Sequence, residues 1–500
     1  MKSELLRWPD LLVLMLSLVG VLVLGPIFAG KITSPDGYFF AGRKIPGWVL
    51  GISLMATIIS SMTFLVMPAF TYVENWRYVP ALSTYLLVAL LTMYLFMPFF
   101  RRENIGSAYE YLEKRFGLWA RIYAGGGFLL FQIFKAAIVL YAVSLAFETM
   151  TGWSVPTLII VIGVIVGFYS VAGGLGAVVW SDFLQAIIMV VAAAVCLPFI
   201  VMKLPGGFSQ IISVAAADHK FAVGSFSPTL YEKTFWVMLL NHIFYFSHFM
   251  CTDQMAVQRY IAARTDKQAR ISIFVSAVTI IPVWGYFSFL GTALYVLYKV
   301  APDEAIAGLP AEQVFPYFIV TSLPVGVVGL VMAGIMAAAM STLSSIINAW
   351  AQILTHDFYR RLLVKGHDER HYLIAGRYFS FLAVMLGMAI ALLIHWARSS
   401  ALMDLQQTFM TVLSGGLLGL FLLGFLTKRV DSQSAFIATA ITVACISFWL
   451  FAKSALGRHL FPKLADILPD DFMINVFSNI LTFGLAYLLS LALGKRAHDR

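Results

Sequence analysis

Long apolar runs separated by short polar stretches follow one another along almost the whole chain. About thirteen of these runs approach the ~20 residues with which an α-helix crosses the hydrocarbon core of a bilayer. Their approximate limits are 10–29, 48–70, 80–100, 118–148, 156–172, 178–201, 235–255, 271–298, 325–356, 378–396, 408–426, 435–453 and 473–493. Because no soluble domain or low-complexity tract interrupts the series, the pattern predicts a single all-α membrane domain.

Composition supports this assignment and offers an explanation of the net positive charge of the chain. The 500 residues are 60% hydrophobic and 12% charged, a balance that a soluble domain of this length does not reach. The formal net charge is +9, which we attribute to Lys and Arg in cytoplasmic loops rather than to a nucleic-acid partner. These loops predict an integral protein of the inner (plasma) membrane, with the amino terminus outside and the carboxyl terminus in the cytoplasm. The first run is interpreted as an uncleaved span rather than a signal peptide.

The three cysteines, Cys196, Cys251 and Cys445, all lie in apolar runs. Their sequence contains no Cys/His spacing typical of a metal site. We therefore expect buried small hydrophobic side chains rather than disulfides or metal ligands.

The ninth run carries a polar face. Ala338, Ser341, Thr342 and Ser345 fall on one side of a helix at the 3.6-residue period. Uncharged oxygens that converge at membrane depth are what a small hard cation such as Na⁺ requires. The alternative is a seam of small residues that lets two helices pack closely. The pattern alone leaves both interpretations open.

The second run contains a cluster of hydroxyls, Ser60, Ser61 and Thr63, with Thr57 before it and Pro68 after it. This pattern predicts a helix that is unwound midway, since unwound backbone at membrane depth is tolerated where it lines a cavity or a ligand. A kink that serves only packing is the alternative.

Two charged residues stand out within apolar runs. Lys135 lies too deep in the fourth run to reach the interface easily, so we expect either a solute-facing role or a structural partner. Asp182 follows a glycine-rich turn at 173–176. It is either a helix N-cap or a carboxylate that faces Ser344 and Ser345 and holds a cation.

The seventh run is unusually polar for a membrane helix. It contains Asn241, His242, Tyr245, His248 and Asp253. Of these, His248 and Asp253 suggest proton coupling, and interhelical hydrogen bonding explains them equally well. The loop that follows, 258–264, is interpreted as an anchor at the inner membrane surface.

Several stretches together resemble the sodium:solute symporter family, whose members have a LeuT-type fold. They are residues 169–185, the helix with Ser60, Ser61 and Thr63, the helix with Ala338, Ser341 and Thr342, residues 107–112 and residues 258–260. The resemblance implies two inverted repeats of five helices, with one helix before them and two after them. The expected divisions are a leading helix and loop at 1–47, repeats at 48–201 and 202–430, and trailing helices at 431–500.

The resemblance also implies ion sites. The family's main Na⁺ site would consist of the carbonyls of Ala56, Ile59 and Ala338 and the hydroxyls of Ser341 and Thr342. A second cation site, found in part of the family, would use Asp182, Ser341, Ser344 and Ser345. The expected cofactor is therefore one Na⁺ or two.

For the solute, the pattern is most similar to the sialic-acid transporter branch. There the hydroxyls equivalent to Ser60 and Thr63 hold a carboxylate, and an arginine stands where this chain has Lys135. The branch also carries a polar side chain at the position of Leu82. The expected solute-binding residues are Ser60, Ser61, Thr63, Lys135, Phe70, Tyr78, Leu82, Asn241 and Tyr245.

The resulting prediction is a sodium-coupled symporter that imports a small polar solute, such as sialic acid or a related sugar, by alternating access. A neutral sugar, an amino acid and a monocarboxylate are the alternative solutes. A proton-coupled carrier would depend on Asp182 or Asp253, and a membrane enzyme would need a catalytic constellation for which His242, His248 and Asp253 form no recognised motif. We therefore expect no enzymatic activity and no obligate protein partner.

Overall fold

The computed structural model of the chain describes residues 7–30, 32–102, 105–397 and 415–492. Within these ranges the regular structure is helical, apart from an isolated parallel bridge between Ile45 and Ala263. The predicted all-α fold is confirmed. The first part of the expected run at 408–426 and the tail at 494–500 lie outside the described residues.

Nine helices in the described ranges are long and apolar enough to cross a membrane, and a bent pair raises the number to ten. The nine are α1–α2 (Trp8–Ala29), α6–α8 (Val79–Arg102), α10 (Leu118–Thr151), α11–α12 (Val155–Lys203), α16 (Asp266–Val300), α18–η4 (Val327–Leu363), α19 (Glu369–Ala397), α22 (Ser432–Lys453) and η5–α25 (Asp471–Ala492). The bent pair is α4 (Gly47–Ile58) and α5 (Ser61–Val73). The polar α14 (Phe235–Thr252) and the short α21 (Leu417–Leu426) match two further expected runs. The full number of about thirteen crossings stays a prediction.

Shorter elements connect these helices. They are α3 (Pro35–Phe40), η1 (Ala41–Arg43), α9 (Ala108–Phe116), α13 (Gly207–Ala217), α15 (Gln254–Ala262), η3 (Glu304–Ile306), α17 (Ala311–Ser322), α23 (Ala455–Leu460) and α24 (Pro462–Ile467). Within the spans, the subdivisions are α1 (Trp8–Leu22), α2 (Leu24–Ala29), α6 (Val79–Leu82), α7 (Thr84–Leu91), η2 (Thr92–Phe96), α8 (Met97–Arg102), α11 (Val155–Ala194), α12 (Cys196–Lys203), α18 (Val327–Ile353), η4 (Leu354–Leu363), η5 (Asp471–Met473) and α25 (Ile474–Ala492).

The glycine-rich turn predicted at 173–176 interrupts α11. Gly174 has φ 54° and ψ −157°, which glycine adopts readily and other residues rarely do, and a Cβ there would overlap the carbonyl of Tyr38. A straight helix of this length would measure about 60 Å, twice the thickness of the hydrocarbon core. Instead Tyr169 lies beside Ser181 and Gln185, so the two halves of α11 fold back on each other.

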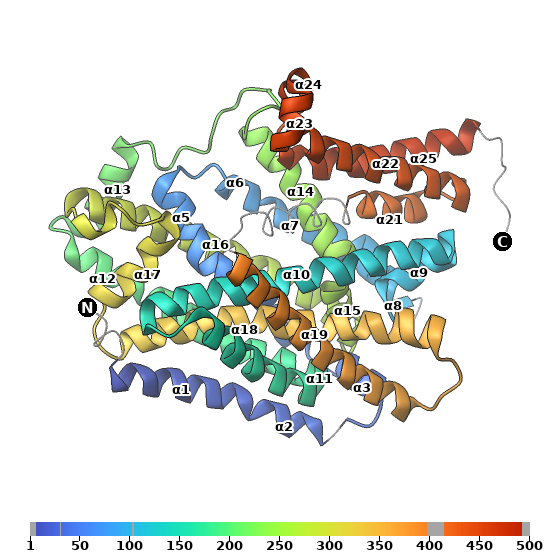
Figure 1. The fold of residues 1–500 in the computed structure, drawn as a ribbon, viewed down its shortest axis with the longest axis horizontal. Helices are drawn as coiled ribbons and strands as arrows, with labels where there is room; N and C mark the ends of the chain where they lie inside the picture. The colour runs from blue at the N-terminus through green and yellow to red at the C-terminus, as the bar shows by residue number, and fades with distance from the viewer. Residues whose placement is uncertain (1–6, 31, 103–104, 398–414, 493–500) are drawn as a thin grey trace.

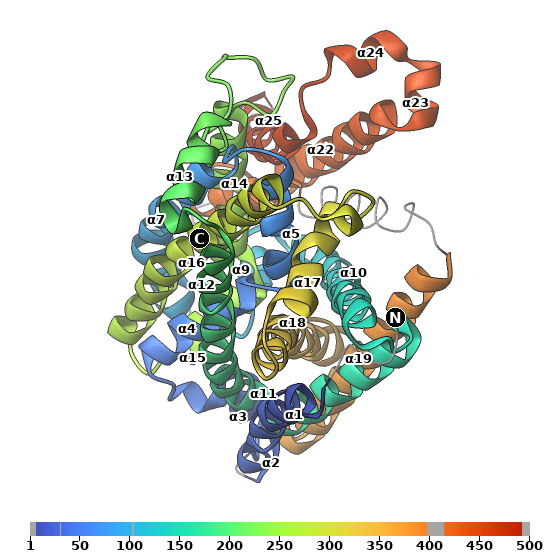
Figure 2. The same ribbon diagram turned by 90° about the vertical axis from the view of Figure 1, so that its left-hand side faces the viewer.

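Helix α18 occupies the centre of the bundle. In its most apolar stretch 94% of the residues are buried, whereas the corresponding value for Trp8–Ala29 is 22%. Helices α1, α4, α10, α11 and α19 all pack against α18, and Figure 2 shows it among α10, α11, α17 and α19. The polar face predicted for this helix is therefore enclosed by protein on every side.

The bent pair α4–α5 is held by close packing against α16. A Cβ at Gly51 would lie 2.7 Å from the carbonyl oxygen of Ser272, and a Cβ at Gly291 would overlap the carbonyl of Pro68. Glycine at these positions lets the helix backbones approach closely. Both halves of the bent pair thus rest on one continuous helix. At the opposite side of the molecule from α1 and α2, α22 and α25 pack together (Figure 1).

Asp10 of α1 caps the start of α18. Its Oδ1 accepts hydrogen bonds from the N–H groups of Gly326 at 2.7 Å and Gly329 at 2.9 Å. The first N–H groups of a helix have no partner within the helix, and the Asp10 side chain is buried. This carboxylate therefore fixes α1 to the central helix.

We expect Asp10→Ala to lower the melting temperature, because it leaves two N–H groups without their acceptor at a cost of about 1–3 kcal/mol. The matched control is Glu369→Ala, which removes an exposed ion pair with Arg360 and should change stability by less than about 0.5 kcal/mol. Thermal unfolding of the purified variants measures both. Equal melting temperatures for the two would contradict the capping role.

Candidate functional site

The predicted unwinding in the second apolar run is confirmed. Helix α4 ends at Ile58, and Ile59 and Ser60 are extended, with φ, ψ of −78°, 101° and −103°, 177°. Helix α5 begins at Ser61, and the axes of the two helices differ by 57°. Pro68 lies within α5, so the extended residues and not the proline form the break.

The break removes donors from the last carbonyls of α4, among them those of Ala56 and Thr57. The last regular bond of the helix runs from the Ile59 N–H to the Met55 carbonyl at 3.0 Å. In a continuous helix the next carbonyls, those of Ala56 and Thr57, would accept from the N–H groups four residues on. Because the backbone turns away at the break, these two carbonyls must find other partners.

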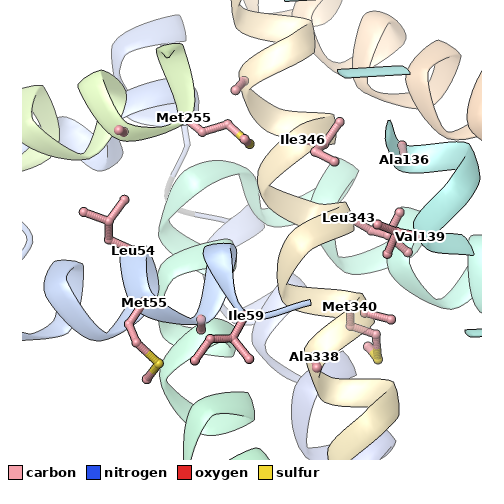
Figure 3. Packing of buried hydrophobic residues seen from close by; sticks show 14 of the residues in the cluster. Leu54, Met55, Ile59, Ala136, Val139, Met255, Ala338, Met340, Leu343 and Ile346 are labelled. Carbon is pink, nitrogen blue, oxygen red and sulfur yellow. The ribbon is translucent and has the colours of Figure 1, made fainter. Parts of the chain in front are cut away.

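The hydroxyl face of α18 supplies these partners. Ser341 Oγ donates to the Ala56 carbonyl at 2.9 Å, and Thr342 Oγ1 donates to the Thr57 carbonyl at 3.1 Å. Both hydroxyls also lie within hydrogen-bonding distance of the Ala338 carbonyl, at 3.1 and 3.3 Å. Figure 3 shows the end of α4 at Ile59 beside Ala338 on α18. Five uncharged oxygens from two helices therefore meet in the buried centre of the protein.

Four of the five residues predicted for the main Na⁺ site contribute to this cluster. The carbonyl that Thr342 contacts belongs to Thr57, a residue that the sequence analysis placed in the broken helix but not in the ion site. The expected contribution of the Ile59 carbonyl to the ion site stays a prediction.

The start of α5 presents unused hydrogen-bonding groups. The first regular bond at this end runs from the Phe64 N–H to the Ser60 carbonyl at 3.2 Å, so the N–H groups of residues 61–63 have no partner within the helix. Ser61 Oγ is buried and has no partner among the described groups. Such a helix start favours an anion.

A second buried centre lies beside the first. Asp182 Oδ2 accepts hydrogen bonds from Ser53 Oγ at 2.6 Å and from the Arg259 guanidinium at 3.1 Å. Arg259 is completely buried, as are the other residues of 258–263, so the interpretation of the loop 258–264 as a surface anchor is wrong. Burial of Arg259 could not be predicted, because it is followed by Arg264, Lys267 and Arg270, as expected for a cytoplasmic loop.

The residues of the predicted second cation site meet at the same place. Ser345 Oγ accepts from Arg259 at 2.6 Å, and Ser344 Oγ donates to the Ser341 carbonyl at 3.2 Å. Asp182 Oδ1 has no partner among the described groups. Of the two predicted roles, Asp182 therefore has the one in which it faces the serines, and the Arg259 guanidinium lies between its carboxylate and Ser345.

Three of the predicted solute-binding residues, Lys135, Asn241 and Tyr245, line one cavity of about 480 Å³. The other lining residues are Phe131, His242, Phe244, His248, Phe249, Asp253, Leu450, Asp471, Phe472, Ile474, Asn475 and Asn479. Within the part of the chain that the structure describes, no carboxylate lies within 4 Å of the Lys135 ammonium. The cavity lining thus holds one cationic group, Lys135, together with the carboxylates of Asp253 and Asp471.

The remaining predicted solute-binding residues are not among those that line this cavity. They are Ser60, Ser61, Thr63, Phe70, Tyr78 and Leu82. The Phe70 and Tyr78 rings lie 5.1 Å apart, and Tyr78 reaches the cavity wall through the Phe472 ring at 6.4 Å. Leu82 is buried. Their contact with solute stays a prediction.

Sequence reasoning missed the contribution of the last helix to the cavity. Asn475 Nδ2 on α25 donates to Asn241 Oδ1 on α14 at 2.9 Å, and both side chains line the cavity. Asp253, considered for proton coupling, is the extended residue between α14 and α15. It accepts from the Met255 N–H at 2.8 Å and from Gln132 Nε2 at 2.9 Å, so it caps a second helix break.

Lys220 fixes the other end of α5. Its Nζ donates to the carbonyls of Tyr72 and Glu74, each at 2.8 Å, and lies 4.1 Å from the centre of the Tyr295 ring. Burial lowers the pKa of Lys220 to about 8, because partial removal from water disfavours the charged form. The last carbonyls of the bent helix pair therefore have a fixed partner too.

Sequence comparison finds relatives that match most of the chain. The chain is 31% identical over 434 residues to the sodium/sialic acid symporter SiaT of Proteus mirabilis, covering 86% of this chain and 87% of that protein. It is 30% identical to the sodium/sialic acid symporter NanT of Aliivibrio fischeri, covering 88% and 87%. It is also 30% identical to the human sodium-coupled monocarboxylate transporter 1, covering 87% and 71%.

Solved structures agree with these relatives. The substrate-bound outward-open state of a Na⁺-coupled sialic acid symporter, which reveals a novel Na⁺ site, superposes with a TM-score of 0.90 at 28% identity, over 99% of this chain and 100% of that one. Mhp1, a nucleobase-cation-symport-1 transporter, shares the fold with a TM-score of 0.59 at 12% identity. A family model matches residues 38–442. These matches agree with the break in α4–α5 and with the hydroxyl face of α18. The chain is therefore an integral membrane protein that belongs to the sodium:solute symporter family.

Proposed function

We propose that this protein is a sodium-coupled symporter of a sugar acid such as sialic acid. The observation that carries the proposal is the meeting of the Ser341 and Thr342 hydroxyls with the carbonyls freed by the break in α4. The two sialic acid symporters among the relatives support the choice of solute.

The oxygen cluster suits Na⁺ better than its competitors. Ca²⁺ takes more ligands and favours carboxylates, and Mg²⁺ keeps most of its water, whereas this cluster is formed by three carbonyls and two hydroxyls. A hydroxyl that donates to a carbonyl can turn its lone pairs toward a cation instead. Without Na⁺ these oxygens therefore form hydrogen bonds with one another, and with Na⁺ they act as its ligands.

An acidic solute fits the groups that remain. Lys135 supplies a positive charge to the cavity, and the first N–H groups of α5 favour an anion. Lysine binds a carboxylate as a point charge, without the two-pronged geometry of arginine, so orientation of the solute depends on neutral groups such as Asn241 and Asn475. A volume of about 480 Å³ favours a molecule of sugar size over a small monocarboxylate.

Transport would follow from alternating access. Na⁺ bound between α4 and α18 stabilises the broken segment, the solute binds beside it, and both are released on the cytoplasmic side after the helices rearrange. A membrane potential of ~100 mV supplies about 2.3 kcal/mol for each Na⁺. The proposal includes an outside amino terminus, a cytoplasmic carboxyl terminus, the repeat boundaries 48–201 and 202–430, and activity without an obligate protein partner or a catalysed reaction.

For the ion site, we expect Thr342→Ala to raise the Na⁺ concentration for half-maximal uptake about tenfold or more. One contact to a charged group contributes about 1.5–3 kcal/mol, and 1.4 kcal/mol corresponds to tenfold. The matched control is Thr439→Ala on α22, where a buried threonine donates only to the Ala435 carbonyl of its own helix. Uptake into proteoliposomes at graded Na⁺ measures the effect, and an unchanged Na⁺ response would reject the assignment.

For the solute site, we expect Lys135→Ala to reduce binding of acidic sugars far more than binding of neutral sugars, and Lys135→Arg to restore acidic sugars in part because it keeps the charge. Competition against uptake of a labelled sugar acid measures both. Equal losses for acidic and neutral sugars would assign Lys135 to structure.

The solute class itself can be identified by thermal shift. Purified protein is heated with sugar acids, neutral sugars, amino acids and monocarboxylates, with Na⁺ or with choline as the cation. A ligand at 100 times its Kd stabilises the folded state by about 2.7 kcal/mol. We expect a sugar acid to raise the melting temperature only with Na⁺, and stabilisation by the same acid in choline would contradict coupling.

A further inference from the structure

The Arg259 guanidinium contacts five groups of a buried polar network. It donates to Thr57 Oγ1 at 2.7 Å, to Ser53 Oγ at 2.9 Å and to the Met255 carbonyl at 2.8 Å. It also donates to Ser345 Oγ at 2.6 Å and to Asp182 Oδ2 at 3.1 Å. These partners come from α4, α11, α15 and α18, so one side chain joins four helices.

A single nitrogen of this group contacts two residues of the predicted second cation site. Arg259 Nη2 contacts the Asp182 carboxylate and the Ser345 hydroxyl at once, and both residues belong to the predicted second cation site. Of the other two, Ser341 Oγ donates to the Ala56 carbonyl and Ser344 Oγ to the Ser341 carbonyl of its own helix. Of the side-chain oxygens of these four residues, Asp182 Oδ1 is the one without a partner among the described groups.

The charge balance leads to the same conclusion. Asp182 and Arg259 are both fully buried, and they neutralise each other across 3.1 Å. A Na⁺ added beside Arg259 would place two cations against one buried carboxylate, and the repulsion between them disfavours it. The residues present therefore do not fit a second Na⁺ while Arg259 is seated.

We propose that Arg259 is a built-in cation that fills the Asp182 site, so that the protein in this conformation binds one Na⁺, at the Ser341 and Thr342 site. The inference rests on the proposed sodium coupling and adds its stoichiometry. It also gives Arg259 a positioning role, because Thr57 contacts Arg259 through its hydroxyl and Thr342 through its carbonyl.

The test is the number of Na⁺ ions bound per protein, measured with radioactive Na⁺ on purified, folded protein. We expect one for the wild type and two for Arg259→Gln, since the free Asp182 carboxylate then takes Na⁺ in place of the guanidinium. Arg259→Lys, which keeps the charge, should bind one. The double variant Arg259→Gln with Asp182→Asn, which removes both buried charges together, should also bind one.

Two bound Na⁺ in the wild type, or one in folded Arg259→Gln, overturns the proposal. If Arg259→Gln does not fold with Asp182 unpaired, the double variant without either charge decides. Two ions in the wild type and one in the double variant overturn the proposal. One ion in both proteins supports the proposal. The proposed function has a separate readout, Na⁺-driven solute uptake by the wild type. Absence of that uptake rejects the proposed function, whereas uptake with two bound ions rejects only the role of Arg259.

Discussion

The hydrogen-bonding needs of backbone in an apolar environment determine the centre of this protein. Two extended residues, Ile59 and Ser60, interrupt α4–α5, and every carbonyl or N–H freed at such a break must be satisfied inside the protein. The carbonyls of Ala56 and Thr57 reach the hydroxyls of α18. The break is therefore tolerated only because a polar face on another helix lies opposite it, and that requirement places the two helices in contact.

The buried charges follow a related constraint. Isolated charges at this depth are costly, so they are paired or are left facing a cavity. Asp182 and Arg259 form a pair with each other, while Lys135 borders the 480 Å³ cavity together with Asn241 and Asn475. The first arrangement joins four helices, and the second places a positive charge at a cavity that Asp253 and Asp471 also line.

The parts that sequence predicted are those with a strong local pattern. The apolar runs predicted the helices, the turn at Gly174 was evident from its glycines, and the hydroxyls near Ser60 predicted a broken helix. The carbonyl of Thr57 could not be assigned to the ion cluster, since every residue has a carbonyl and only the end of α4 selects this one. Arg259 was misplaced because a basic residue near other basic residues is typical of a loop at the membrane surface. Asn475 was missed because its partner Asn241 is distant in sequence.

Thr57 belongs to both buried clusters. Its side chain belongs to the network of Arg259 and Ser345, while the oxygen of its peptide group belongs to the cluster of Thr342. Because both groups belong to one residue, a displacement of the Thr57 Cα shifts its carbonyl oxygen and its hydroxyl together. The two centres are thus mechanically linked through a single amino acid, with no longer relay of side chains between them.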